Sequence, residues 1–224
     1  MTFEELMPAV KVENYRSERG ARAYLEDHER KLHRRLSDRR ERNILRAFLG
    51  RCGEVEQLID VPCGFGRLLD LLRSSAGEVL QADFSPSMLA LNRKLHGDEV
   101  AKYLECSALE IPRPDGSFDM SVSVRLSHHL DQLEDRQRHI RELCRVSRRH
   151  VIMTFFSGKS LKNRLRVLRS RWNGKRRKNT LMPADVRRVF AGCGFRVDAM
   201  QSLARIGSGH VYVLASREAP FIVT

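Results

Sequence analysis

The chain has 224 residues, 42% of them hydrophobic, and a formal net charge of +13 at pH 7. This length and composition predict one domain with a sizeable core and at most a terminal extension. No apolar run approaches the ~20 residues that a membrane-spanning helix needs, and the N-terminal stretch lacks the pattern of a secretory signal, so we expect a cytoplasmic protein. The basic charge favours anionic partners such as nucleic acid, lipid headgroups or phosphorylated substrates.

The cysteines give no indication of a disulfide framework or a metal site. They form no C-x-x-C pair and no Cys/His cluster at zinc spacing, and they are widely scattered: Cys52, Cys63, Cys106, Cys144 and Cys193. We therefore expect free thiols in a reducing compartment and no metal.

Residues 1–50 are highly charged and have apolar residues at irregular helical spacing, which predicts an N-terminal helical extension. Ser37 and Asp38 resemble a helix start, so we expect a break there and a second helix that runs to about Leu49. Residues 51–224 then form the main domain.

From residue 56 the apolar spacing alternates between strand and helix patterns. Strand patterns cover 56–61, 78–84, 101–107, 117–124, 150–156, 196–203 and 210–217. Helix patterns cover 66–75, 85–96, 131–147 and 183–195. Ser85 with Pro86, and Pro183, mark helix starts, while Gly192 or Gly194 marks a helix end.

This alternation predicts an α/β fold with a mostly parallel sheet that helices cover on both faces. The connection between the last two strands is too short for a crossover helix, so these strands should form an antiparallel hairpin.

The sequence DVPCGFG follows the first strand, where an open α/β sheet binds ligands. Gly64 and Gly66 allow a ligand to approach the backbone, and the following helix start points N–H groups at an anion. Asp60 suits a cationic group. Asp83 ends the second strand at the spacing where an acidic residue meets ribose hydroxyls. A ligand with a ribose, a carboxylate and an ammonium group satisfies these features.

At these residues the sequence resembles the class I S-adenosylmethionine-dependent methyltransferases, closest to the ubiquinone/menaquinone-biosynthesis-type branch. The resemblance covers about 56–216, with LIDVPCGFG, QADFSPSML, ECSALEIPRPDGSFDMSVSV, LSHHL and AGCGF in the expected order. It implies a three-layer Rossmann-like methyltransferase fold with a seven-stranded, mostly parallel sheet. It also implies S-adenosyl-L-methionine as cofactor.

The resemblance assigns residues to parts of the cofactor. The methionine portion is implied to contact Asp60, Cys63, Gly64 and Gly66. The adenosine portion is implied to contact Asp83 at the ribose and Phe84, Met88, Ser107 and Ala108 at adenine. Arg125 is implied to border the methyl-transfer pocket.

Two residues of the expected cofactor site depart from the family pattern. Pro62 replaces a common glycine, which removes one N–H and fixes φ. Ser107 replaces a common aspartate, and its hydroxyl can accept a hydrogen bond only without charge. These departures leave open a protein that binds the cofactor without catalysis and acts as an accessory protein.

Methyl transfer from a sulfonium is an in-line displacement that needs alignment rather than a general acid. A hydroxyl or acidic C–H acceptor also needs a base. His128 and His129 follow the fourth strand on the substrate side, so either could assist deprotonation, although each could equally cap or pack the next helix.

A basic insertion at 157–179 contains ten Lys and Arg residues between 159 and 178 and no acidic residue. Its leucines and Trp172 recur at helical spacing, which predicts an amphipathic helix. Three interpretations stay open: a contact with an anionic membrane surface, a contact with a phosphate backbone, or a lid over the domain itself. Tyr15 and Tyr24 in the extension could form a second part of that lid.

We therefore predict an S-adenosylmethionine-dependent methyltransferase that acts on a small or lipid-associated, anionic acceptor. The protein would be cytoplasmic, with peripheral membrane contact through 159–178 as one option. An RNA methyltransferase is the alternative enzyme, but the sequence contains no separate RNA-binding module. A nicotinamide dehydrogenase fits the ordered motifs poorly.

Overall fold

The computed structural model describes residues 17, 19–20, 22–23, 32–97, 99–160, 179–204 and 208–221, with only the backbone for 32–36. Its strands are β1 (Gln57–Asp60), β2 (Glu78–Asp83), β3 (Lys102–Glu105), β4 (Phe118–Ser123), β5 (Ser147–Phe156), β6 (Phe195–Ser202) and β7 (His210–Arg217). Its helices are α4 (Leu32–Leu49), α5 (Leu69–Arg73), α6 (Pro86–His96), the 3-10 turn η1 (Ser127–His129), α7 (Leu133–Val146) and α9 (Pro183–Gly192).

The seven strands form one sheet in the order β3-β2-β1-β4-β5-β7-β6. Pairs among β1 to β5 are parallel, whereas β7 is antiparallel to both β5 and β6. The predicted α/β fold, with its mostly parallel sheet and C-terminal antiparallel hairpin, is therefore confirmed. Strand order reverses on the two sides of β1, so ligands are expected beyond its carboxyl end.

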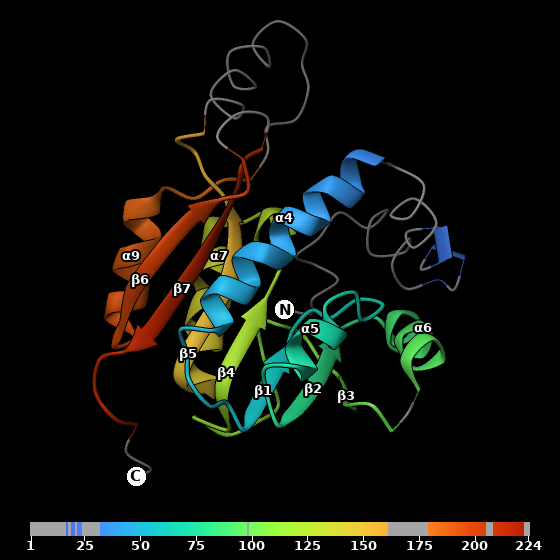
Figure 1. Ribbon diagram of the computed structural model, residues 1–224. Helices are drawn as coiled ribbons and strands as arrows, with labels where there is room; N and C mark the ends of the chain where they lie inside the picture. The colour runs from blue at the N-terminus through green and yellow to red at the C-terminus, as the bar shows by residue number, and fades with distance from the viewer. Residues whose placement is uncertain are drawn as a thin grey trace, which may run out of the picture.

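Helices cover both faces of the sheet, as Figure 1 shows. On one face, α4 lies across the strands and buries Leu45 and Phe48 against β1, β4 and β7, next to α5. On the other face, α7 and α9 bury Leu143 and Phe190 in a second apolar cluster. The sheet is thus the middle of three layers, as predicted.

Local sequence signals explain the helix starts. The Ser85 hydroxyl accepts a hydrogen bond from the Met88 N–H at 3.2 Å, which confirms the predicted cap of α6. Proline stands in the first turn of both α6 and α9, where its missing N–H costs nothing. The first turn of α7 contains Glu134 and Asp135, whose charges favour a helix N-terminus.

The predicted helix break at Ser37 and Asp38 is wrong, because α4 is continuous through both residues. The Asp38 carboxylate does not cap a new helix. It pairs instead with Arg42 one turn later, at 3.0 Å, and with Arg67. The predicted helix from Gly66 also begins later, at Leu69, because turns occupy the residues before it.

Several predictions fall on residues that the structure does not describe. Most of the basic segment, 161–178, lies outside the described residues, as do Tyr15 and Tyr24. Within the part of the chain that is described, no helix is both long and apolar enough to cross a bilayer. All five cysteines are described, and each has a free thiol.

Candidate active site

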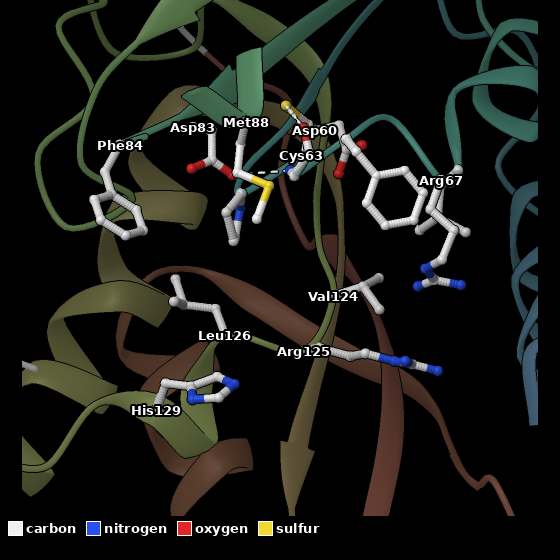
Figure 2. A pocket seen from close by; sticks show the side chains of 14 residues that line it. Asp60, Cys63, Arg67, Asp83, Phe84, Met88, Val124, Arg125, Leu126 and His129 are labelled. Carbon is white, nitrogen blue, oxygen red and sulfur yellow. Dashed lines mark hydrogen bonds between the residues drawn. The ribbon is translucent and has the colours of Figure 1, made fainter. Parts of the chain in front are cut away.

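A pocket opens beyond the carboxyl ends of β1, β2 and β4, at the position that the strand order predicts. Figure 2 shows side chains from these strands and from the following loops around it. The lining residues are Asp60, Pro62, Cys63, Gly64, Phe65, Arg67, Leu68, Asp83, Phe84, Met88, Val124, Arg125, Leu126 and His129. Nine of the thirteen residues predicted for the site are therefore brought together here.

Two buried carboxylates end adjacent strands of the pocket. Asp60 is 2% exposed and Asp83 is 3% exposed. Burial raises the pKa of Asp60 to about 7, against a hydrogen bond from Gln81 and the charge of Arg67. Burial also raises the pKa of Asp83 to about 6, against backbone N–H groups that include those of Ser85 and Gly64. Both groups would be better stabilised as carboxylates by a ligand that brings positive charge or hydroxyl donors.

The glycine loop is anchored to β2 and α6. Asp83 Oδ2 accepts a hydrogen bond from the Gly64 N–H at 2.8 Å, and the Cys63 N–H donates to the Ala82 carbonyl at 2.8 Å. Gly64 has φ +57° and open space where a Cβ would stand. The loop therefore presents bare backbone toward the pocket in a conformation that glycine adopts readily.

Two polar residues that the sequence analysis did not single out, Gln81 and Asn92, connect α6 to Asp60 beneath the glycine loop. The Asn92 amide donates to Gln81 Oε1 at 3.0 Å, and the Gln81 amide donates to Asp60 Oδ2 at 3.1 Å. A Cβ at Gly66 would stand 2.3 Å from Asn92 Oδ1, and Gly66 has φ +80°. Gly66 does not line the pocket, but its lack of a side chain allows α6 to approach the loop.

Arg125 links the pocket to the N-terminal helix. It has φ +68°, an uncommon conformation for a residue with a side chain. Its N–H donates to Thr154 Oγ1 at 2.7 Å, and its Nε donates to Glu41 Oε2 at 3.1 Å. Glu41 comes from α4 and also pairs with Arg67 and the hydroxyl of Tyr212.

The charges around Glu41 explain how a carboxylate is kept in the core. The Glu41 side chain is fully buried, and burial alone would raise its pKa. Arg67, Arg125 and the Tyr212 hydroxyl outweigh burial and lower the pKa below its usual value. The Glu41 carboxylate therefore holds two arginines at one end of the pocket, opposite Asp83 and Phe84 (Figure 2).

The two candidate histidines have different surroundings. His129 lines the pocket, near Leu126 in Figure 2. His128 does not line it, and its ring stacks on Phe156 at 4.2 Å between ring centres and lies 5.3 Å from the ring of His210. The geometry favours His129 over His128 as the group that reaches a reacting molecule.

Ser107 and Ala108 lie in the loop between β3 and β4 and do not line the pocket. The Ser107 hydroxyl accepts a hydrogen bond from the Leu109 N–H at 3.1 Å, and Ala108 is 3% exposed. Their predicted adenine contacts remain predictions.

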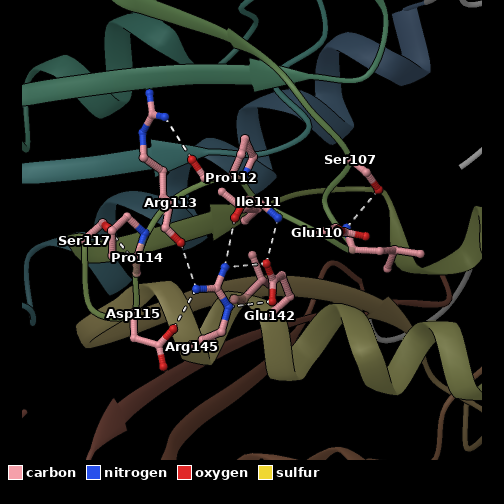
Figure 3. Close-up of polar contacts among 12 residues, drawn as sticks. Ser107, Glu110, Ile111, Pro112, Arg113, Pro114, Asp115, Ser117, Glu142 and Arg145 are labelled. Atoms are coloured by element: carbon pink, nitrogen blue, oxygen red, sulfur yellow. Dashed lines mark hydrogen bonds and ion pairs between the residues drawn. The ribbon is translucent and has the colours of Figure 1, made fainter. Parts of the chain in front are cut away.

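The rest of this loop is fastened to α7, as Figure 3 shows. Arg145 donates to the carbonyls of Ile111 and Arg113 at 2.9 and 2.8 Å. Glu142 Oε1 accepts a hydrogen bond from the Ile111 N–H at 2.7 Å. The backbone of the loop between β3 and β4 is thus held to α7.

The side chains and backbone groups that line the pocket fit the expected cofactor. Asp60 and Asp83 provide buried acceptors, Gly64 provides bare backbone, and Phe84 and Met88 provide apolar surface on the side of β2. A charged nucleoside with an amino-acid group would satisfy all of these groups. Among the described residues, no group of three or more His, Cys, Asp or Glu could hold a metal ion.

Comparisons with known proteins agree with this geometry. Residues 59–155 match the family model described as methyltransferase domain. Demethylmenaquinone methyltransferase from Thermus thermophilus is 36% identical over 96 residues, which cover 41% of this chain and 42% of that protein. The corresponding enzyme of Clavibacter sepedonicus is 33% identical over 92 residues, which cover 41% of this chain and 36% of that protein. The chain thus matches about two fifths of the length of these relatives.

The whole fold has a solved counterpart. Magnesium protoporphyrin IX methyltransferase from Synechocystis, crystallised with S-adenosylhomocysteine, superposes with a TM-score of 0.75 at 17% identity and covers 94% of this chain and 100% of that one. The fold is therefore the Rossmann-like fold that this methyltransferase also has. Residues 59–155, less than half of the chain, are thus similar to the methyltransferase domain model and to demethylmenaquinone methyltransferases.

Proposed function

We propose that this protein transfers a methyl group from S-adenosyl-L-methionine to a small or lipid-associated, anionic acceptor. The observation that carries the proposal is one pocket with two buried carboxylates, Asp60 and Asp83, on one side and His129 on another. The carboxylates suit the charged and hydroxyl groups of the cofactor, and the imidazole suits proton removal from an acceptor.

Each group of residues then has a distinct role. Asp60 and the backbone at Cys63 and Gly64 hold the amino-acid part of the cofactor, while Asp83 accepts hydrogen bonds from the ribose. Phe84 and Met88 pack on the base. When bound, the cofactor supplies an electrophilic methyl group on a sulfonium.

The acceptor side of the pocket is formed by residues that follow β4. Val124 and Leu126 give apolar walls that exclude water, and Arg125 adds positive charge. His129 accepts the proton of an acceptor hydroxyl or acidic C–H as the methyl group is transferred, and alignment supplies much of the acceleration.

Two observations support the proposed type of acceptor: the net positive charge of the chain and the acceptors for which its relatives are named. The chain has a net charge of +13, and its relatives are named for demethylmenaquinone while a solved neighbour is named for a magnesium porphyrin. Both are large conjugated molecules, and the apolar walls suit such an acceptor. Attachment of the basic segment 159–178 to an anionic membrane would bring the pocket near a lipid-associated molecule.

The proposal is tested by measuring S-adenosylhomocysteine formation with the purified chain and a panel of acceptors. The panel holds reduced naphthoquinols, porphyrin carboxylates and unmodified RNA, each with and without vesicles of anionic lipid. Turnover of a quinol or porphyrin, increased by vesicles, is the expected result. Methylation of RNA alone would support the alternative enzyme, and cofactor binding without any turnover would support an accessory protein.

A further inference from the structure

Two thiols meet where α7 and α9 pack together, outside the pocket described above. Cys144 stands in the last turn of α7 and is 1% exposed, whereas Cys193 follows the end of α9 and is half-buried. A hydrogen bond joins the two side chains, although they are distant in the sequence. Neither residue lines the pocket. The fold therefore places two thiols in contact that the proposed methyl transfer does not use.

Two guanidinium groups lie beside this pair of thiols. The Arg217 side chain donates to the Cys144 carbonyl at 3.0 Å and to the Ser147 carbonyl at 2.8 Å, so it is fixed next to the end of α7. Its Nη1 also lies 3.9 Å from the position that a Cβ on Gly194 would take. Arg141 stands on α7, one turn before Cys144, and is exposed. Both cations favour a thiolate over a thiol.

The two thiols differ in how readily they ionise. The hydrogen bond from the Cys144 thiol is the main cause that lowers the pKa of Cys193 to about 7. The two guanidinium groups act in the same direction, and burial opposes them. Burial raises the pKa of Cys144 itself well above its usual range, so this group stays a thiol. Near neutral pH, Cys193 is thus partly a thiolate, which is the form of cysteine that reacts with oxidants.

The other three cysteines have the opposite surroundings. Burial is the main cause that raises the pKa of Cys52 to about 11 and that of Cys106 to about 12, and it also raises the pKa of Cys63. Cys193 stands between two exposed glycines in the sequence AGCGF, so neither neighbour along the chain has a side chain that could shield it. Oxidation should therefore select Cys193.

We propose that Cys193 is a peroxide-reactive site and that Cys144 converts its oxidised form to a disulfide between α7 and α9. The Cys193 thiolate attacks one oxygen of hydrogen peroxide, the O–O bond breaks, and the other oxygen leaves as hydroxide and takes up a proton to form water. The Cys144 thiol then attacks the sulfur of the sulfenic acid, and its proton leaves with the sulfenic oxygen as water. Two thiols thus lose two electrons, and one peroxide is reduced to two water molecules.

The disulfide closes a loop that contains β5 and the basic segment 157–179. Oxidation would thus tie together the two ends of the part of the chain that carries most of its excess charge. In a reducing compartment such a bond forms transiently and is reversed by thiols, as for regulatory disulfides. The inference does not rest on the proposed function, since neither step uses the cofactor or its pocket.

The test measures thiol chemistry on the full chain without cofactor. Alkylation with iodoacetamide at pH 7, followed by peptide mass spectrometry, compares the rates of Cys193 and Cys106, which are both half-buried. Cys193 should react at least about tenfold faster, because a larger fraction of it is thiolate. Treatment with an equal concentration of hydrogen peroxide should then give a peptide pair joined through Cys144 and Cys193, which dithiothreitol separates.

Three variants separate the roles of the two thiols. Cys144→Ser should still react with peroxide but should stop at a sulfenic acid, which dimedone labels. Cys193→Ser should form no disulfide and should leave Cys144 reduced, because that thiol is buried and protonated. Cys106→Ser is the matched control and should form the disulfide at the wild-type rate.

Two results would overturn the inference. One is alkylation of Cys193 no faster than that of Cys106. The other is peroxide treatment of the wild type that yields sulfinic acid at Cys193, or a disulfide with a different cysteine, instead of the bond to Cys144. Both measurements are made on the wild type, so they decide the matter even if a variant does not fold. Neither depends on cofactor binding, so the methyltransferase proposal is tested separately.

Discussion

Asp60 lies at the end of β1 in a position where its charge depends on what fills the pocket. Burial raises the pKa of its carboxyl to about 7, and that of Asp83 to about 6. A bound ammonium stabilises the carboxylate and so lowers the pKa of Asp60 in the complex. Binding of such a ligand is then linked to proton release near neutral pH.

The first prediction concerns the pH dependence of cofactor binding. Because Asp60 must lose a proton to bind an ammonium, affinity for S-adenosylmethionine should fall as pH decreases below 7, by up to about tenfold per pH unit. Calorimetry between pH 8 and 5.5 measures this, with Asp60→Asn expected to bind weakly and with a flatter profile. Asp70→Asn, at an exposed position of α5, is the matched control. Equal affinity for the wild type across this range would contradict the role of Asp60.

The second prediction separates the two histidines after β4. His129→Ala should lower turnover by about 10²- to 10⁴-fold with little change in cofactor affinity, since it removes the proton acceptor that lines the pocket. His128→Ala should lower turnover by less than about tenfold, because the His128 ring stacks on Phe156 and does not line the pocket. Both effects are measured as initial rates of S-adenosylhomocysteine formation, with an acceptor of the panel that the wild type methylates. A His129→Ala variant as active as the wild type would exclude it as the base.

At the scale of elements, the contact between the glycine loop and α6 gives a third prediction. Gly66→Ala should weaken cofactor binding and lower stability by about 1–3 kcal/mol, because Gly66 has a positive φ and a Cβ would clash with Asn92. Gly192→Ala is the control, since Gly192 ends α9 with open space around its Cβ position. Thermal unfolding and cofactor titration measure both effects. No difference between the two variants would show that the loop adapts freely.

Helices and strands were predicted well where the apolar spacing is regular. The α6 start followed from Ser85 and Pro86, and the hairpin of β6 and β7 followed from its short connection. The prediction of a helix break at Ser37 was wrong, because residue types that cap helices also form side-chain pairs within a helix. Asp38 pairs with Arg67, which is distant in the sequence, and no local pattern reports such a contact.

The difference between local patterns and contacts distant in the sequence also explains which parts of the site were predicted. Asp60, Asp83 and the glycines follow strand ends, so their meeting at one edge of a parallel sheet could be inferred. Glu41 could not, because its helix is charged throughout and its partner Tyr212 lies 171 residues away. Gln81 gave a weak signal, as a polar residue in an otherwise apolar strand.

For the molecule as a whole, a buried histidine should affect stability in mild acid. Burial lowers the pKa of His139 on α7 to about 4, and its Nε2 lies 2.9 Å from Ser123 Oγ. In the unfolded chain the pKa is about 6.5, so the unfolded state gains a proton first as pH falls. This group stabilises the fold above pH 6.5, and that contribution is lost progressively toward pH 4.

The fourth prediction follows from this loss of stability as pH falls. Between pH 7.5 and pH 5.0, His139→Gln should lose about 2 kcal/mol less of its free energy of unfolding than the wild type. Asp60 and Asp83 act in the opposite direction in both proteins and cancel in the comparison. Urea unfolding at the two pH values measures the difference, with His96→Gln on α6 as the control. An identical pH response of the His139→Gln variant would refute it.

The central claim is that one pocket at the ends of β1 and β2 binds S-adenosylmethionine. Its most direct test is calorimetric titration of the purified chain with S-adenosylmethionine and S-adenosylhomocysteine, repeated for Asp60→Asn and Asp83→Asn. The predicted result is saturable binding of one ligand per chain that each substitution weakens by at least about tenfold, the cost of losing a charged hydrogen-bond partner. No binding by the wild type, or binding that neither substitution alters, would contradict the claim.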